Sequence, residues 1–458
     1  MKKNVLSIAA TAVLLSGLAA CSSTTSTSGS TSEAPGPDAL KNAKGVTTIT
    51  LWHGITGSNG DQLQKLIDQF NDNNKGKIRV TSTFQGAYAD LLAKYTASLR
   101  SKSAPTVMIA GDVATGYMTD VKQSIPAADM ARANPGDLKL DDLVPAASSY
   151  YAVNGVQQAV PFNVSTPMLW VNRDLLRQAG IPDSAPLKTL DQVVSAAKTV
   201  YAKTGVNGFT MPDDDWYIEQ LTSSSGENFC TPDNGRKGKA PTGIAINRGT
   251  AKEAINKIAD LYTSGAAVDG DPQGNAAYDI FVAGKVAFDF YSSGVNSGFK
   301  SDAKFDFQAL PFPTNGPKAS SGPIIGGSSL WLSSTAKPAA QVAGWKLESF
   351  LASAKSQEQF SQATGYIPVN KKTLESSSEK KFLAADKNAQ AFVDQVTNTP
   401  AVTQTAGCVT GAMTTIRTGN INQLQAAFAG QKSVDEALNQ AASDAKTALQ
   451  QYKSQLGN

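Results

Sequence analysis

Residues 47–84 read TTITLWHGITGSNGDQLQKLIDQFNDNNKGKIRVTSTF. Apolar and polar side chains alternate along residues 47–53, which is a strand pattern. Residues 63–70 place apolar side chains at i, i+3, i+4 and i+7, the stripe of an amphipathic helix. A second strand, another helix and a third strand follow within residues 78–109. Strands and helices alternating in this way predict an α/β fold with a mostly parallel, helix-covered sheet.

The same alternation starts again after Pro167. Met168–Val171 predicts a strand, Asp174–Ala179 predicts a helix, and Thr189 with Gln192 has the spacing of a capping box. Further expected elements are strands at 285–291 and 324–332 and helices at 190–201, 342–354 and 434–452.

Two α/β lobes joined by more than one crossing segment account for this pattern. We expect residues 46–162 plus 304–340 in the first lobe and residues 163–303 plus 341–458 in the second. Ligands of such folds bind at the carboxyl ends of strands, in the crevice between lobes.

Composition excludes several kinds of function. The chain has 458 residues, 41 Lys and Arg against 38 Asp and Glu, and a formal net charge of +3. This balance offers no electrostatic footprint for nucleic acid. The only histidine is His53, so metal sites built on two or three histidines are excluded, and we expect no metal or cofactor. The acidic run Asp213–Asp215 follows Pro212 and is predicted to be a solvated turn.

The first 45 residues have the composition of an export signal and a linker. Residues 1–20 combine two lysines with a short apolar stretch, typical of a signal peptide. Cys21 directly follows Leu18-Ala19-Ala20, which resembles a bacterial lipobox, whose cysteine carries lipid. Ser, Thr and Pro dominate residues 21–45, a predicted flexible linker. We expect a lipid-anchored protein on the extracytoplasmic face of the cell membrane; a plain secretory peptide is the alternative.

Two further cysteines, Cys230 and Cys408, remain in the folded part. An even pair outside the cytoplasm predicts a disulfide, with two buried thiols as the alternative. Two isolated cysteines lack the ligands of a metal site.

Several predicted strand ends lead into loops that mix aromatic with small polar residues. Hydroxylated ligands need this mixture: aromatic faces contact the carbon skeleton, while hydroxyls and main-chain amides bind the oxygens. The loops are at 52–54, 85–88, 162–167, 292–294, 326–331 and 364–368.

The segment Leu169–Asp174, with Ala179-Gly180-Ile181 after it, resembles the strand-to-helix signature of the extracellular solute-binding proteins of ABC importers, in the maltose-binding class. Residues 326–332 and 365–369 are similar to later landmarks of that class. The resemblance implies a type II periplasmic-binding-protein fold and a monomer that passes a small polyhydroxylated solute to the transmembrane permease subunits.

Within that class the chain most resembles the subfamily that binds glycerol-3-phosphate and glycerophosphodiesters. The resemblance implies that an acidic residue, here Asp112, holds glycerol hydroxyls. The other ligand residues that it implies are Tyr88, Ser165, Ser292, Gly327 and Tyr366, to which we add Trp52 and, as the nearest match to a further tryptophan, Trp216.

One position departs from the subfamily. Its phosphate-binding arginine falls on Val409 in the stretch 407–411, and valine supplies neither charge nor donors. Either Arg417 or a lysine replaces it, or the solute is not a phosphate monoester. A carrier for a mono- or oligosaccharide is therefore the alternative prediction. An extracellular enzyme acting on glycans or phosphodiesters and a surface adhesin or sensor partner are further alternatives.

Overall fold

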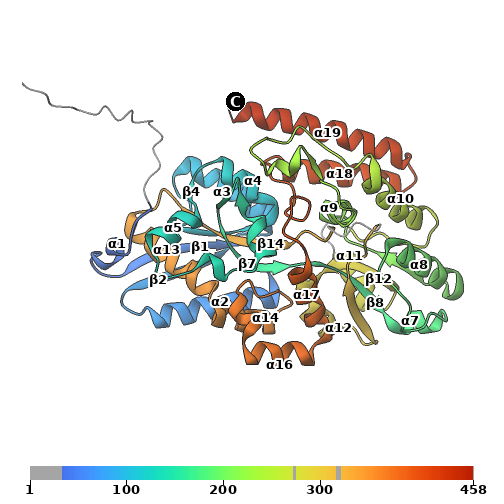
Figure 1. Cartoon of the computed structure of the whole chain (residues 1–458), viewed down its shortest axis with the longest axis horizontal. Coiled ribbons are helices and arrows are strands. Elements are labelled where there is room, and N and C mark those ends of the chain that lie inside the picture. The colour runs from blue at the N-terminus through green and yellow to red at the C-terminus, as the bar shows by residue number, and fades with distance from the viewer. Residues whose placement is uncertain (1–33, 272–274, 316–320, 457–458) are drawn as a thin grey trace, which may run out of the picture. The chain divides into compact units, whose positions relative to one another are not determined.

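A computed structural model describes residues 34–271, 275–315 and 321–456. The predicted signal peptide, Cys21 and residues 21–33 of the predicted linker lie outside the described residues. Residues 34–458 form one compact unit, drawn in Figure 1.

The first sheet contains the three strands predicted within residues 47–109. Its order is β2 (Ile78–Phe84), β1 (Thr47–His53), β3 (Val107–Gly111), β14 (Gly326–Ser333) and β4 (Ser124–Ile125), and β7 (Val160–Ser165) also pairs with β14. Strands β2 and β3 run parallel to β1, whereas β14 runs antiparallel to β3, β4 and β7. We call the part of the chain built on this sheet the first lobe.

The second sheet has the order β13 (Phe307–Pro311), β8 (Pro167–Asn172), β12 (Val286–Ser292) and β9 (Asn207–Thr210). Strand β9 runs parallel to β12, while β8 is antiparallel to both β12 and β13. The part built on this sheet is the second lobe. Both sheets are therefore mixed rather than mostly parallel, because strands that return from the other lobe, such as β14, enter in the opposite direction.

Helices cover both sheets. Helix α2 (Gly57–Asn73) buries the predicted apolar stripe, Leu63, Leu66, Ile67 and Phe70, against the first sheet. Helix α8 (Leu190–Thr204) begins with the predicted capping box, in which Thr189 accepts from the main-chain N–H of Gln192. The other longer helices are α3 (Tyr88–Ser101), α9 (Asp215–Ser224), α10 (Gly249–Thr263), α13 (Pro338–Leu351), α14 (Ala354–Ala363), α17 (Lys387–Asn398), α18 (Met413–Phe428) and α19 (Val434–Gln455).

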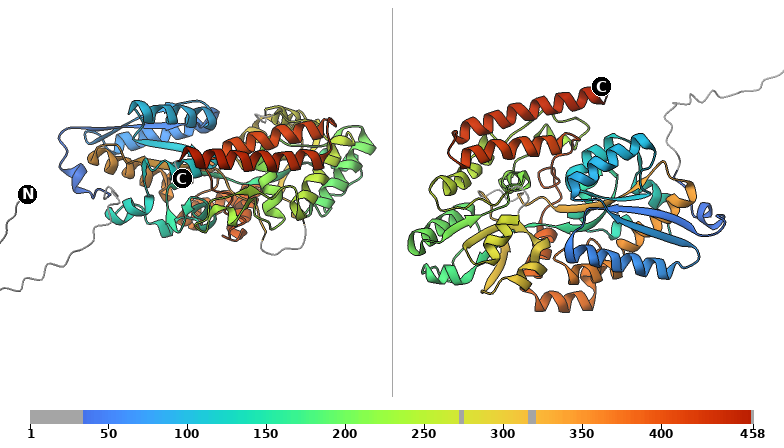
Figure 2. Two further views of the ribbon diagram at one scale, coloured as in Figure 1. Left: turned by 90° about the horizontal axis from the view of Figure 1, so that it is seen from above. Right: turned by 180° about the vertical axis from the view of Figure 1, so that it is seen from behind.

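Shorter helices complete the lobes, and α18 and α19 form the antiparallel pair that Figure 2 shows side by side. The shorter helices are α1 (Asp38–Lys41), α4 (Thr115–Asp120), α5 (Ala127–Ala133), α6 (Pro145–Tyr150), α7 (Arg173–Gln178), α11 (Asn275–Val282), α12 (Asn296–Asp302), α15 (Lys371–Glu375) and α16 (Ser377–Ala385).

The division of the chain between the sheets differs from the predicted lobe boundaries. Strand β13 pairs with β8, so residues 307–311 belong to the second lobe rather than the first. Helices α13 and α14 pack on β1, β14 and α2, so they belong to the first lobe rather than the second. Local periodicity identifies a strand or helix but does not say which sheet it joins.

The predicted linker also ends earlier than expected. Ala34 and Leu40 pack against the apolar core of the first lobe, and the Asn134 side chain donates to the Pro35 carbonyl at 3.0 Å. The composition of this segment, with its Pro and Lys residues, indicates a flexible chain. Composition alone therefore could not predict contacts made by single apolar residues such as Leu40.

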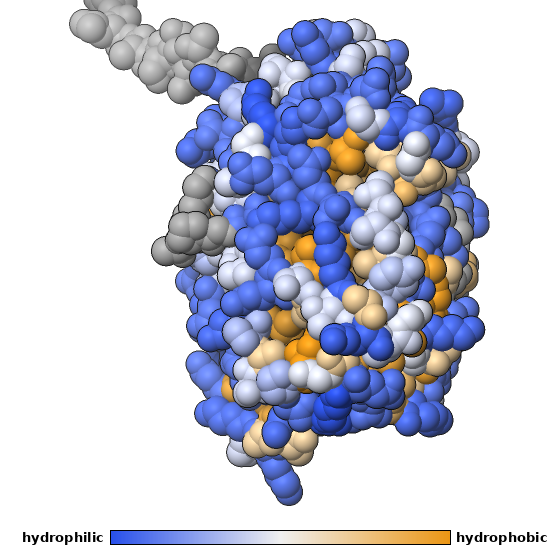
Figure 3. Space-filling model, turned by 90° about the vertical axis from the view of Figure 1, so that its right-hand side faces the viewer, coloured by the Kyte–Doolittle hydropathy of each residue, from blue (hydrophilic) through white to orange (hydrophobic). Residues whose placement is uncertain are grey.

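The chain passes between the lobes at three places in the described ranges: from β7 to β8, from β13 to β14, and from α16 to α17. Within these ranges no helix combines the length and the hydropathy needed to cross a membrane. Hydrophilic residues cover most of the face in Figure 3, and its apolar residues form separate small patches.

Candidate functional site

A cavity of about 370 Å³ lies between the lobes, and we call it the interlobe cavity. The first lobe contributes residues from the ends of β3, β7 and β14, and the second lobe contributes residues from the end of β12 and from α9 and α18. Its size falls within the range of ordinary small-molecule sites. The lining residues are Tyr88, Ala89, Asp112, Val113, Ser165, Pro212, Asp214, Trp216, Tyr217, Tyr291, Ser292, Gly326, Gly327, Tyr366 and Arg417.

All of the predicted ligand residues except Trp52 line this cavity. They reach it because most of them follow strands: Asp112 directly follows β3, whereas Ser165 and Ser292 are the last residues of β7 and β12. Trp52 is half-buried against the apolar core of the first lobe and does not line the cavity. Sequence position placed it near a strand end, but its side chain belongs to the packing of that sheet.

Aromatic side chains from both lobes form much of the cavity wall. Tyr88 accepts a hydrogen bond from the Asn163 amide at 3.1 Å, and Tyr366 stacks on Phe360 with ring centroids 5.7 Å apart. Burial raises the pKa of both tyrosines, so their hydroxyls stay protonated and can donate. The Trp216 ring packs edge-on against Tyr217, and both belong to α9.

The glycine pair at the start of β14 makes room for this aromatic wall. A Cβ atom on Gly326 would lie 2.7 Å from the Trp216 ring, so only glycine lets the second lobe's tryptophan approach β14. Gly327 has φ +102°, and a Cβ there would lie 1.8 Å from the Asn163 carbonyl oxygen. The main chain itself thus forms part of the cavity wall.

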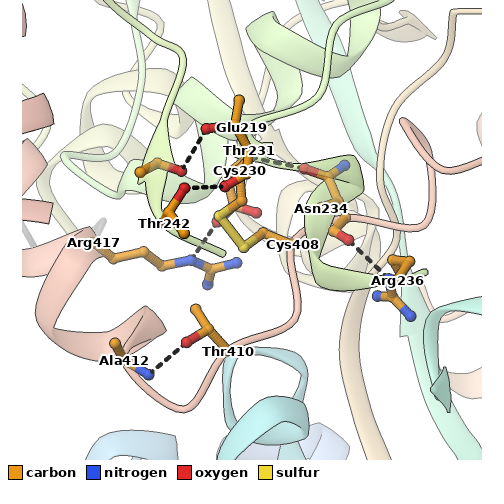
Figure 4. The surroundings of a disulfide bond; sticks show 12 residues. Glu219, Cys230, Thr231, Asn234, Arg236, Thr242, Cys408, Thr410, Ala412 and Arg417 are labelled. Atoms are coloured by element: carbon orange, nitrogen blue, oxygen red, sulfur yellow. Dashed lines mark hydrogen bonds and ion pairs between the residues drawn. A yellow bond between two sulfur atoms is a disulfide. The ribbon is translucent and has the colours of Figure 1, made fainter. Parts of the chain in front are cut away.

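The cation among the residues that line the cavity is Arg417 on α18. Its Nε donates to Glu219 Oε1 at 2.6 Å, and its Nη2 lies 3.5 Å from Asp112 Oδ2 across the cleft. The side chains of all three residues are at most 13% exposed. Burial raises the pKa of Glu219 to about 7 and raises that of Asp112, while Arg417 opposes both shifts. Figure 4 shows Glu219 and Arg417 beside the disulfide.

The acidic run Asp213–Asp215 is not the predicted solvated turn. Asp213 and Asp215 are 2% and 1% exposed, and they accept hydrogen bonds from Gln425 at 2.7 Å and from Asn420 at 3.0 Å. Both donors lie on α18, so the run ties α9 to the helix that carries Arg417. Asp214 caps α9 by accepting from the main-chain N–H of Trp216, and it lines the cavity.

Val409 does not line the interlobe cavity. It lines a separate cavity of about 280 Å³ together with residues such as Asp120 and Tyr452, and its N–H donates to the Asn234 carbonyl at 2.9 Å. Arg417 does line the interlobe cavity, and the sequence had suggested it only as one possible replacement for the missing arginine.

A disulfide and an arginine that donates to main-chain carbonyls lie next to the interlobe cavity, and we call the two together the brace. A disulfide joins Cys230 to Cys408. Cys230 begins β10 (Cys230–Thr231), which pairs antiparallel with β11 (Gly243–Ile244). From the loop between these two strands, Arg236 donates to the Tyr150 carbonyl of the first lobe at 2.7 Å and to the Gly407 carbonyl at 2.9 Å. The guanidinium thus ties the segment around Cys408 to the first lobe, and Figure 4 shows Arg236 near the disulfide.

Comparisons with known proteins agree on one group. The family described as bacterial extracellular solute-binding protein matches residues 65–391. The sn-glycerol-3-phosphate-binding periplasmic protein UgpB of Escherichia coli strain K12 is 27% identical over 421 residues, which cover 90% of this chain and 95% of that protein.

Solved structures share the fold. UgpB from Mycobacterium tuberculosis in complex with glycerophosphocholine has a TM-score of 0.74 at 21% identity, over 90% of this chain and 99% of that one. The cyclic alpha-maltosyl-1,6-maltose binding protein from Arthrobacter globiformis has a TM-score of 0.72 at 21% identity, over 88% and 99%. The type II periplasmic-binding-protein fold is therefore common to carriers named for very different solutes.

Proposed function

This chain belongs to the bacterial extracellular solute-binding proteins, and from that premise we propose that it carries a neutral polyhydroxylated solute to an ABC importer. The solute is a small sugar or a neutral glycerol compound rather than a phosphate monoester. Family membership supports the small-solute ligand, the permease partner and the extracytoplasmic location. The charges of the interlobe cavity support the narrower choice of solute.

The observation that carries the proposal is the pairing of Arg417. Its guanidinium already contacts Glu219 at 2.6 Å and Asp112 at 3.5 Å, and the carboxylate of Asp214 lines the same cavity. A phosphate dianion that enters the cavity would find one cation, Arg417, which Asp112 and Glu219 already contact. Together with Asp214, three carboxyl groups would then lie near the phosphate. Like charges at such distances repel, and the low-dielectric surroundings strengthen that repulsion.

A neutral polyol fits the same groups. The Asp112 carboxylate can accept hydrogen bonds from two adjacent hydroxyls of the solute. The hydroxyls of Ser165 and Ser292 can donate to the solute or accept from it. The faces of Trp216 and Tyr366 suit the C–H surface of a sugar ring or a glycerol chain. Closure of the lobes around such a solute would remove it from water before delivery to the permease.

A second candidate is a glycerophosphodiester or glycerol-3-phosphate. The observation in its favour is that the residues carried over from that subfamily surround one cavity together with Arg417. In this alternative the anion replaces Asp112 as the partner of the guanidinium. The same relatives are named as binding proteins, which favours a carrier over the glycan- or phosphodiester-acting enzyme.

We further propose that the mature protein is a monomer tethered to the cell membrane through lipid on Cys21. The order of residues 1–33, a basic start, an apolar stretch, the cysteine and a Ser/Thr-rich segment, supports this proposal. Metabolic labelling with a fatty acid would test it, because Cys21→Ser should abolish labelling and release the protein from membranes.

Calorimetric titration of residues 34–458 tests the choice of solute. The ligands are glucose, maltose, glycerol, glycerol-3-phosphate and glycerophosphocholine. We expect saturable binding of a neutral compound, lost in Trp216→Ala, and at least about tenfold weaker binding of glycerol-3-phosphate. Tighter binding of glycerol-3-phosphate than of every neutral ligand would refute the proposal and support the second candidate.

A further inference from the structure

We infer that Glu219 sets the charge selectivity of the interlobe cavity by holding Arg417 away from anionic solutes. This inference rests on the proposed function and deepens it, because it names the residue that makes the cavity favour neutral solutes. Glu219 does not line the cavity, so it acts through Arg417 as a positioning residue.

Glu219 lies one helical turn below the cavity wall. It follows Trp216 by three residues on α9, so the two side chains share a face of that helix, and Trp216 lines the cavity. Its side chain is 1% exposed, against 13% for Arg417. The carboxylate therefore contacts the inner side of the guanidinium, while the outer side faces the cavity.

The contacts with Glu219 and Asp112 take up the Nε/Nη2 edge of the guanidinium, one of the two edges through which an anion could bind. Arginine binds phosphate and carboxylate best through two parallel N–H bonds from one edge of its planar group. Glu219 Oε1 holds Nε at 2.6 Å, and Asp112 Oδ2 lies 3.5 Å from Nη2. An anion can no longer bind both of these nitrogens side-on without displacing a buried carboxylate.

The Arg417 contact also bears on the cost of burying the Glu219 carboxyl group. Oε2 of Glu219 has no hydrogen-bond partner within the described part of the chain, so this oxygen is directed at no other donor there. A buried carboxyl group with an unsatisfied oxygen is unfavourable for folding. The contact with Arg417 offsets part of this cost, because a neighbouring positive charge favours the ionised carboxylate.

Glu219→Gln tests the inference, because it keeps the size of the side chain and removes its charge. Glu348→Gln is the matched control: Glu348 is also 1% exposed, has one oxygen without a partner, and lies in α13, away from the cavity. Each variant would be titrated with glycerol-3-phosphate and with the neutral solute found for the wild type. Thermal melting checks that each is folded, and Glu219→Leu replaces the glutamine variant if that variant does not melt cooperatively.

At pH 8, above the pKa of about 7 that burial gives Glu219, we expect the Glu219 variant to bind glycerol-3-phosphate at least about tenfold more tightly than the wild type, because the negative charge that neutralises Arg417 has been removed. Affinity for the neutral solute should change about threefold at most, and the control should change neither. Adding Arg417→Gln to the Glu219 variant should cancel the gain, a result that a purely structural role for Glu219 would not produce.

The outcomes separate the two proposals. A wild type that binds glycerol-3-phosphate more tightly than any neutral solute overturns the proposed function. A wild type that prefers a neutral solute, with a folded Glu219 variant that gains no affinity for the anion, overturns only the role of Glu219.

Discussion

Glu348 in α13 makes the stability of this protein depend on pH. The residue is 1% exposed, and its Oε1 has no hydrogen-bond partner within the described part of the chain. Burial alone raises the pKa of this carboxyl group from 4.5 to about 8. The folded protein therefore keeps a proton on Glu348 at neutral pH, whereas the unfolded chain releases it.

The sign of the effect follows from proton binding. Because the folded state holds more protons than the unfolded state between pH 4.5 and about 8, stability falls as the pH rises through that window. The stability that Glu348 contributes is fully present below pH 4.5 and is lost by about pH 8. At about 1.4 kcal/mol per pH unit, the free energy of unfolding falls by roughly 5 kcal/mol on this account.

Glu348→Gln should remove this dependence, because the amide does not ionise. We expect the variant to gain stability over the wild type steadily from pH 5 to pH 8, by up to roughly 4 kcal/mol at pH 8. Urea unfolding followed by tryptophan fluorescence at pH 5, 6, 7 and 8 measures the difference. Glu375→Gln, which changes an exposed acid in α15, is the control and should leave the pH profile unaltered.

A stability difference between the Glu348 variant and the wild type that stays constant across these four pH values would refute the reasoning. It would mean that the carboxyl group ionises alike in the folded and unfolded states, or that water reaches it in the core.

Three further predictions concern the brace and the glycine pair. Arg236→Met should lower the free energy of unfolding by about 3–5 kcal/mol, because buried carbonyls of both lobes lose their donor; a change under about 1 kcal/mol in urea titration would contradict this. Reduction of the Cys230–Cys408 disulfide should cost about 2–5 kcal/mol, measured by the same titration with and without reductant, and an unchanged midpoint would count against the bond. Gly327→Ala should lower both the melting temperature and solute affinity, since its Cβ would lie 1.8 Å from the Asn163 carbonyl oxygen; binding at the wild-type level would show that β14 can move aside.

Local patterns predicted the elements well. The apolar stripe of residues 63–70 became the buried face of α2, and the Thr189–Gln192 box begins α8. Both depend on residues within one or two turns of each other, so a single sequence contains the whole signal. The loops after strand ends could be predicted for a related reason, since ligands of α/β folds bind where strands end.

The errors concern side chains whose partners are distant in the chain. Asp213 and Asp215 look like a solvated turn until α18 places Gln425 and Asn420 against them. The contact between Glu219 and Arg417 could not be predicted from the sequence. Every residue of α9 is buried, so the helix lacks the exposed polar face that periodicity detects. Arg417 also lies 198 residues further along the chain.

Two α/β lobes, with polar and aromatic loops after the strand ends, could be predicted from the amino-acid sequence, because helix and strand periodicity, caps and turns are set by near neighbours. The folded chain was needed to show which strand joins which sheet, which loop residue lines the interlobe cavity, and which carboxylates neutralise Arg417. Those choices depend on packing and on electrostatic contacts between residues far apart in the chain, and such contacts leave no periodic trace in a single sequence.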